Sequence, residues 1–122
     1  TFHAGKVYFP GGTPDPNDII DGKVDLEFSV RRELKEETGL DAAEFAVEPG
    51  WTAAIDGGLI VQIKVFRSNH DAETLRARIL GQLAHEKQPE FSDIRIVRGT
   101  GDFDATMPRF VTAFLAQRFA GA

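Results

Sequence analysis

The chain has 122 residues, of which 42% are hydrophobic and 27% charged, so residues 1–122 are expected to form one soluble globular domain with a single core. The net charge of −5 argues against a general electrostatic grip on nucleic acid or on an anionic membrane. The lack of cysteine excludes disulfides and fits a cytoplasmic protein, and no apolar run is long enough to span a bilayer.

The first part of the chain predicts one strand and one helix. Residues 5–9 (GKVYF) are typical of a short strand, which ends at a loop over 10–18 rich in Pro, Gly and Asp. Asp25 is expected to cap a helix over about 26–38. Gly39 follows as a left-handed stop, with the apolar Leu40 directly after it.

The rest of the chain mixes strands and helices. The pattern predicts, in order, strands within 44–55 and 59–68, a helix over about 72–86, a strand over 92–99 and a helix over 107–119. The turn DGG separates the first two strands, and Asp71 caps the helix that follows. Because strands and helices do not alternate strictly, the expected class is α+β, or a mixed α/β sandwich.

Three glutamates gather near the end of the first predicted helix. Its expected inward stripe consists of Leu26, Val30 and Leu34. Measured from Leu26 at about 100° per residue, Glu37 falls at about +20°, Glu33 at about −20° and Glu36 at about −80°. The three carboxylates are therefore predicted on the inward stripe and its flank, away from the solvated face.

Three carboxylates at these positions are unfavourable in an isolated helix. Like charges three and four residues apart cost about 0.2–0.5 kcal/mol per pair, and carboxylates near the C-terminus oppose the helix dipole. Arg32, four residues before Glu36, can relieve one charge but not three. A divalent cation can relieve the others, and carboxylate oxygens suit Mg²⁺ or Mn²⁺. The alternative is an ordinary surface helix rich in Glu and Lys.

Two glycines before the helix strengthen the metal interpretation. Gly11 and Gly12 allow the backbone to approach a metal or a phosphate closely. Glycines followed by a helix reading RELKEETGL resemble the Nudix hydrolase family, whose pattern is G-x5-E-x7-R-E-U-x-E-E-x-G-U, with U aliphatic. The chain matches every fixed position in the second half of this pattern: Arg32, Glu33, Leu34, Glu36, Glu37, Gly39 and Leu40.

The first half of the family pattern is not matched. Gly12 lies twenty positions before Arg32, where the pattern has fourteen, so the loop carries six extra residues. The first motif glutamate would fall on Val24, which has no carboxylate. A loop acid such as Asp21 or Asp25 could replace it, and the loop could instead shape the substrate pocket.

A second pair of acids lies downstream in HEKQPEF, residues 85–91. This segment resembles a loop of some nucleotide-hydrolysing Nudix proteins that supplies a further glutamate as metal ligand or general base. Glu86 is the first candidate and Glu90 the second, the latter also as a substrate contact. The alternative for each is an ordinary surface acid.

The resemblance implies a helix–sheet–helix sandwich with a mixed sheet, whose N-terminal strands are expected to be missing before Thr1. It implies metal-dependent hydrolysis of a diphosphate linkage in a nucleoside diphosphate derivative, a small-molecule substrate, with a homodimer left open. Glu33, Glu36 and Glu37 would hold Mg²⁺ or Mn²⁺, with the Gly12 carbonyl completing the shell. Gly11 and Gly12 would also face the substrate, and Arg32 would pair with a motif glutamate. Glu33 or Glu86 would activate water.

Two rival functions remain open. The Val24 substitution is compatible with a Nudix-fold module that binds a nucleotide without hydrolysing it. The segment 17–28 also resembles an EF-hand calcium loop, but Ile19 and Phe28 stand at positions where an acid is needed.

Overall fold

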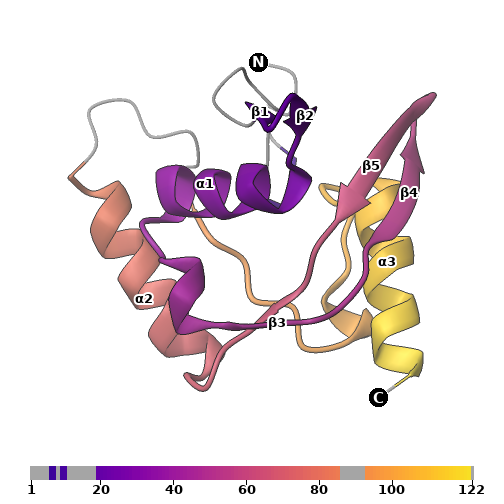
Figure 1. Cartoon of the computed structure of the whole chain (residues 1–122). Helices are drawn as coiled ribbons and strands as arrows, with labels where there is room; N and C mark the ends of the chain where they lie inside the picture. Colours follow the sequence, from indigo (N-terminus) through magenta and orange to yellow (C-terminus); the bar gives the residue numbers. More distant parts are fainter. Residues whose placement is uncertain (1–5, 8, 11–18, 86–92, 122) are drawn as a thin grey trace. The chain divides into compact units, whose positions relative to one another are not determined.

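The computed structural model describes residues 6–7, 9–10, 19–85 and 93–121 (Figure 1). Their helices are α1 (Leu26–Thr38), α2 (Ala72–Leu83) and α3 (Arg109–Ala120). Their strands form three antiparallel pairs: β1 (Ile19–Ile20) with β2 (Lys23–Val24), β3 (Ala46–Val47) with β6 (Phe66–Arg67), and β4 (Thr52–Asp56) with β5 (Leu59–Ile63). The predicted α+β class is confirmed. Because every pairing among the described strands is antiparallel, the mixed sheet stays a prediction.

The chain divides into two compact units, and each is described by itself. Unit 1 comprises Thr1–Phe9, Trp51–Ile63 and Arg95–Ala122. Unit 2 comprises Pro10–Gly50 and Lys64–Ile94. The β4–β5 hairpin and α3 thus belong to unit 1, while α1, α2 and the other two strand pairs belong to unit 2. The expectation of one domain over the whole chain stays a prediction.

Helix α1 begins and ends where the sequence predicts. The Asp25 carboxylate accepts a hydrogen bond of 3.0 Å from the backbone N–H of Phe28, which caps the N-terminus. At the other end, Gly39 adopts a left-handed φ of 76° and donates its N–H to the Lys35 carbonyl at 2.9 Å. The Thr38 hydroxyl accepts a hydrogen bond from the Leu40 N–H at 3.2 Å, which directs the chain toward the core.

The core of unit 2 is formed where α1 and α2 contact each other. Its buried centre consists of Leu40, Ile79 and Leu83. Partly buried side chains pack around this centre: Leu34, Phe45, Leu75, Leu80 and Ile94. Helix α2 therefore buries the face that its sequence periodicity predicts. In α1, however, Leu26 is 40% exposed, so the predicted inward stripe does not extend to the first turn.

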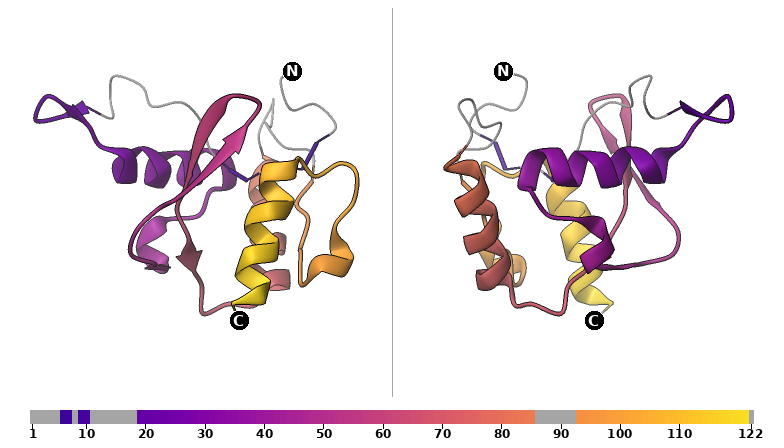
Figure 2. Two further views of the ribbon diagram at one scale, coloured as in Figure 1. Left: turned by 90° about the vertical axis from the view of Figure 1, so that its right-hand side faces the viewer. Right: turned by 60° about the vertical axis from the view of Figure 1, so that its left-hand side comes forward.

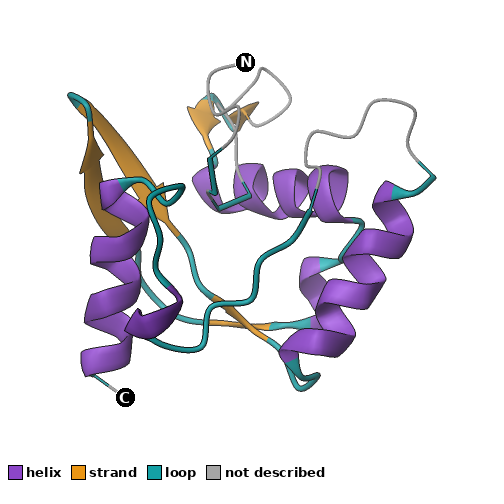
Figure 3. Ribbon diagram, turned by 180° about the vertical axis from the view of Figure 1, so that it is seen from behind, coloured by secondary structure: helices purple, strands orange, loops and turns teal. Residues whose placement is uncertain are grey.

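In unit 1 the β4–β5 hairpin lies beside α3 (Figure 3). Gly57 and Gly58 both have positive φ angles, 54° and 90°, as a two-residue type I′ turn requires. Helix α3 buries Phe110 and Val111. The ring of Phe9 stands edge-on to Phe110, with the ring centroids 6.2 Å apart.

Two of the predicted strands are wrong where the structure describes them. Lys6, Val7 and Phe9 lie outside any strand, although the Val7 N–H donates to the Thr106 carbonyl at 2.9 Å. Residues 93–98 also form no strand. A side chain rather than a neighbouring strand bonds to the backbone here: the guanidinium of Arg76 donates a hydrogen bond to the Ile94 carbonyl at 2.7 Å.

Two helix boundaries also differ from the prediction. Helix α2 ends at Leu83 rather than 86, shortly after Gly81, which weakens a helix interior. Helix α3 begins at Arg109 rather than 107, because Pro108 disfavours a helical conformation for the residue before it.

The stop of α1 gives a stability prediction. Replacing Gly39 by alanine is expected to destabilise the fold by about 1–3 kcal/mol, because an L-residue is strained at positive φ. In addition, a Cβ at this position would lie 2.5 Å from Cγ of Gln82, so the side chain from α2 must move. Denaturant unfolding of wild type and variant measures the difference.

Gly50 provides the matched control, because its φ is 80° and a Cβ there would meet no atom within 4 Å. Gly50→Ala therefore carries backbone strain alone and should destabilise less than Gly39→Ala. The double variant Gly39→Ala/Gln82→Ala should recover most of that difference, since only the Cβ of residue 82, at 3.1 Å, then remains close. Equal losses for the two single variants would show that the contact with Gln82 has no energetic weight.

Candidate functional site

The motif residues lie together on the C-terminal half of α1. Side-chain exposure is 17% for Arg32 and 14% for Glu33, but 56% for Glu36. Glu37 is 5% exposed, the only buried carboxylate among the described residues. The predicted inward placement is therefore confirmed for Glu33 and Glu37 but wrong for Glu36, which lies on the exposed side of the helix.

Arg32 joins two of these glutamates. Its Nη1 lies 3.1 Å from Oε1 of Glu33 and 2.9 Å from Oε2 of Glu36. The predicted pairing of Arg32 with a motif glutamate is confirmed. Because one nitrogen contacts both carboxylates, Arg32 draws together two negative groups that would otherwise repel each other.

The pairing with Glu33 could not be read from helix periodicity. Neighbouring positions i and i+1 do not face each other on a helix, whereas i and i+4 do. The length of the arginine side chain allows its guanidinium to reach Glu33 as well as Glu36. The only sequence feature that could have indicated this contact is that Arg32 and Glu33 are adjacent. Both side chains are largely buried, so the ion pair is shielded from solvent.

The end of the helix that carries Glu37 is held firmly. The Thr38 side chain is 2% exposed, and its hydroxyl donates to the Leu34 carbonyl. Together with the Gly39 cap, this hydrogen bond fixes the last turn. The Glu37 carboxylate is therefore held on a rigid, buried turn of the helix.

The glutamates of this helix are of the right chemical type to bind a divalent cation, but too few of them lie close together. Carboxylate oxygens are the ligands that Mg²⁺ and Mn²⁺ prefer. Within the described ranges, however, no three acidic or histidine side chains are grouped closely enough to hold a metal ion. The remaining candidates Gly11, Gly12, Glu86 and Glu90 lie outside the described residues.

Two carboxyl groups outside α1 have lowered pKa values. A hydrogen bond from the Thr106 hydroxyl, followed by one from Arg95, lowers the pKa of Asp104 to about 2. A hydrogen bond from Arg78 lowers the pKa of Glu44. Both carboxylates are exposed and both tie a loop to its neighbours, so these shifts indicate structural contacts rather than a second candidate site.

The loop before the helix forms a hairpin where the structure describes it. Strands β1 and β2 pair Ile19 with Val24 and Ile20 with Lys23 across the turn of Asp21 and Gly22. The hairpin stands at the N-terminal end of α1 (Figure 2). Val24, at the position where the Nudix pattern has its first glutamate, is 53% exposed within β2. Asn17, the first position of the alternative calcium loop, lies outside the described residues.

Comparison of the chain with protein-family models, with curated proteins and with solved structures finds no match. The Nudix resemblance therefore depends on the motif residues of α1. No helix in the described part of the chain has the length and apolar character needed to cross a bilayer.

Proposed function

We propose that the protein is a Nudix-type hydrolase that cleaves a diphosphate linkage in a nucleoside diphosphate derivative, with Mg²⁺ or Mn²⁺. The observation that carries this proposal is the pairing of Arg32 with two motif glutamates, Glu33 and Glu36, on a well-capped helix that also carries the buried Glu37. The helix–sheet–helix sandwich with a mixed sheet is part of the same proposal.

Each motif residue has a role in this scheme. Glu36 and Glu37 bind the metal, and Glu33 is a third ligand or an orienting base. Arg32 positions Glu33 and Glu36 through the ion pairs that it makes with both. The Gly12 carbonyl is proposed as a further ligand, with Gly11 and Gly12 beside the phosphates. When bound, the metal offsets negative charge on the diphosphate.

Water is activated in this proposal by a carboxylate. Glu86 is the first choice because it comes from a different loop and is not required to bind metal, and Glu90 is the second. If neither acts, Glu33 is the remaining base. A general base must lie within about 2.6–3.2 Å of the attacking water, directly or through one further water.

The test is a turnover assay of the chain on a panel of nucleoside diphosphate derivatives, with Mg²⁺, with Mn²⁺ and with EDTA. Metal-dependent release of mononucleotide or phosphate is expected for at least one substrate. The control is Glu36→Gln/Glu37→Gln under the same conditions. Release that is unaffected by EDTA and by both substitutions would contradict the proposal.

A second candidate function is a nucleotide-binding or regulatory module without hydrolysis. The observation that favours it is Val24, which stands exposed in β2 where the family pattern has a glutamate. Calorimetry separates the two functions: this module would bind a nucleoside diphosphate derivative with no product formed over hours.

The β1–β2 hairpin gives a prediction about substrate choice. The hairpin has six residues, Ile19–Val24. This is also the number of extra residues between Gly12 and Arg32 relative to the Nudix pattern. Deleting 19–24 is expected to change the relative activity on different substrates more than the rate on the best one, because the hairpin borders α1 but carries none of the motif carboxylates. The panel above measures this, and an equal loss on every substrate would assign the hairpin to folding or to chemistry.

A further inference from the structure

The side-chain hydroxyl of Thr38 links the last turn of α1 to the residues beyond it. Thr38 is the final residue of the helix, and its side chain is buried. The hydroxyl donates a hydrogen bond of 2.5 Å to the Leu34 carbonyl, one turn back in the helix, and accepts one of 3.2 Å from the Leu40 N–H. A single oxygen atom therefore joins two backbone groups that lie on either side of Glu37 in the chain.

The N–H of Leu40 depends on this hydroxyl. Among the described residues no backbone carbonyl accepts from it, whereas the neighbouring Gly39 N–H donates to the Lys35 carbonyl at 2.9 Å. Leu40 lies in the buried centre of the unit 2 core, where a donor without a partner is costly. Without the hydroxyl, the chain after α1 either leaves this N–H unpaired or rotates around Gly39 until a carbonyl of the last turn accepts it.

Glu37 lies in the stretch of chain that the hydroxyl spans. Leu34 and Leu40 both pack into the unit 2 core, so both ends of the stretch are fixed by side-chain packing. A change of backbone conformation between them must therefore move the residues inside the stretch, and Glu37 stands directly before Thr38. The Glu37 side chain is buried, which leaves it little freedom to compensate by changing its own conformation.

We propose that Thr38 is a positioning residue of the proposed metal site, whose hydroxyl holds the Glu37 carboxylate in place to bind Mg²⁺ or Mn²⁺. This inference rests on the proposed function. Thr38 touches neither the metal nor the substrate in that scheme and acts through the backbone of α1. Binding groups must be held within about 0.5 Å of their productive geometry, so a small shift of this turn is enough to weaken binding. The Nudix pattern leaves position 38 unspecified and assigns it no role.

Thr38→Val and Thr38→Ser separate the effect of the hydroxyl from that of the rest of the side chain. Valine keeps the branched shape without the hydroxyl, and serine keeps the hydroxyl without the methyl group. Calorimetry with Mn²⁺ as the only ligand measures the Kd of each variant. Thr38→Val is expected to raise this Kd about tenfold or more, as the loss of groups that orient metal ligands does, and Thr38→Ser by about threefold or less.

Asp71→Ala is the matched control for lost stability. Asp71 caps α2 in the same unit, where its carboxylate accepts a hydrogen bond of 2.7 Å from the Thr74 N–H, and it forms no part of α1. Loss of this cap should lower the melting temperature, because an uncapped helix N-terminus is less stable, but leave the Kd for Mn²⁺ unchanged. A merely structural role of Thr38 predicts the same result for Thr38→Val.

Amide hydrogen exchange of the metal-free chain gives a readout that needs no metal. The N–H of Leu40 should exchange at least about tenfold faster in Thr38→Val than in wild type, because its hydrogen-bond partner is lost. In Thr38→Ser the rate should stay near that of wild type. Each rate is compared with that of the Ile79 N–H in α2, which removes the effect of overall stability.

Circular dichroism confirms that each variant is folded. An unchanged Kd or an unchanged Leu40 exchange rate in folded Thr38→Val overturns the inference and leaves the proposed function standing, and so does an equal rise of the Kd in Asp71→Ala. If Thr38→Val does not fold, Thr38→Ser decides, because a tenfold loss of affinity in a variant that keeps the hydroxyl contradicts the inference and retained affinity supports it. A wild-type chain that binds no Mn²⁺ overturns the proposed function together with the inference.

Discussion

Substituting both Glu36 and Glu37 by glutamine is expected to abolish the thermal stabilisation that Mg²⁺ or Mn²⁺ gives the wild-type chain. A metal that binds only the folded state raises its stability by RT ln(1 + [L]/Kd), about 2.7 kcal/mol at a hundredfold excess over Kd. Glutamine keeps the size of glutamate but removes its charge, so the metal-free chain should stay folded and lose little beyond the exposed Arg32–Glu36 ion pair, about 0–1 kcal/mol. Hydrolysis by the double variant should fall at least about a hundredfold.

Glu27→Gln is the matched control for this experiment. Glu27 lies on the same helix and is also ion-paired, at 3.5 Å from Arg31, but it stands in the first turn. It tests whether any loss of a carboxylate on α1 lowers the metal effect. If the metal-induced rise in melting temperature persists in Glu36→Gln/Glu37→Gln, the metal binds elsewhere and the proposed site is wrong.

The parts of the fold that the sequence predicted are those specified by local chemistry. Helix α1 has the predicted bounds because an aspartate caps its start and a left-handed glycine ends it, and both signals act within a few residues. The glycine turn of β4–β5 is local in the same sense. In each case the residues that determine the structure lie within a few positions of one another in the sequence.

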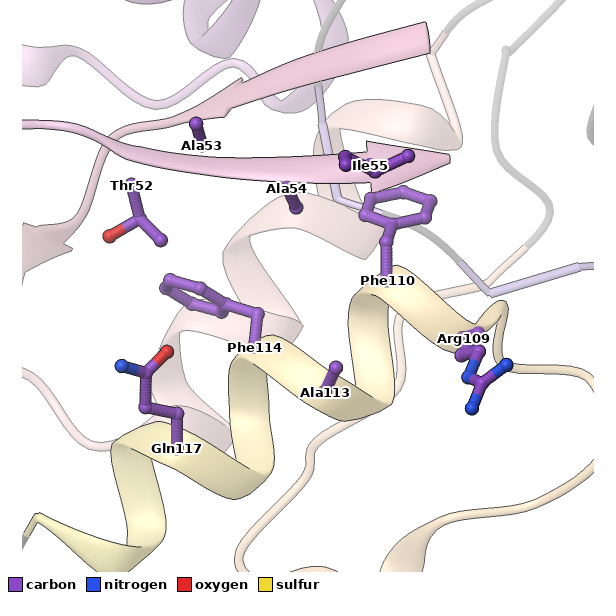
Figure 4. Close-up of a pocket in the computed structure, with 9 residues that line it drawn as sticks. All are labelled: Thr52, Ala53, Ala54, Ile55, Arg109, Phe110, Ala113, Phe114 and Gln117. Carbon is purple, nitrogen blue, oxygen red and sulfur yellow. The ribbon is translucent and has the colours of Figure 1, made fainter. Parts of the chain in front are cut away.

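The parts that sequence patterns missed depend on distant partners. Residues 93–98 alternate as a strand would, yet Arg76, eighteen positions before Ile94, bonds to the backbone there. In the candidate site, the contact of Arg32 with Glu33 depends on a side-chain conformation that periodicity does not describe. The cavity between β4 and α3 is lined by residues from two segments far apart in the sequence, so no local pattern describes it (Figure 4).

The identity of the carboxylate that activates water can also be tested, because its loss should strongly lower the rate of hydrolysis. A carboxylate bound to a metal is a poor base, and Glu33 is already engaged by the Arg32 guanidinium at 3.1 Å. The sequence after α2 carries two acids outside the motif, Glu86 and Glu90, to which the proposal assigns no metal. Loops held by rigid helices commonly supply such residues.

Glu86→Gln is therefore expected to lower kcat by at least about a hundredfold with little change in KM, because loss of a general base typically costs 10²–10⁴-fold in rate. Glu73→Gln, an exposed acid in the first turn of α2, should leave both constants near their wild-type values. Steady-state kinetics on the best substrate of the panel measures the split between kcat and KM. If Glu86→Gln and Glu90→Gln each retain near-normal kcat, the base lies within α1. Glu33 is then the candidate, because Glu36 and Glu37 are assigned to the metal and Arg32 orients the Glu33 carboxylate.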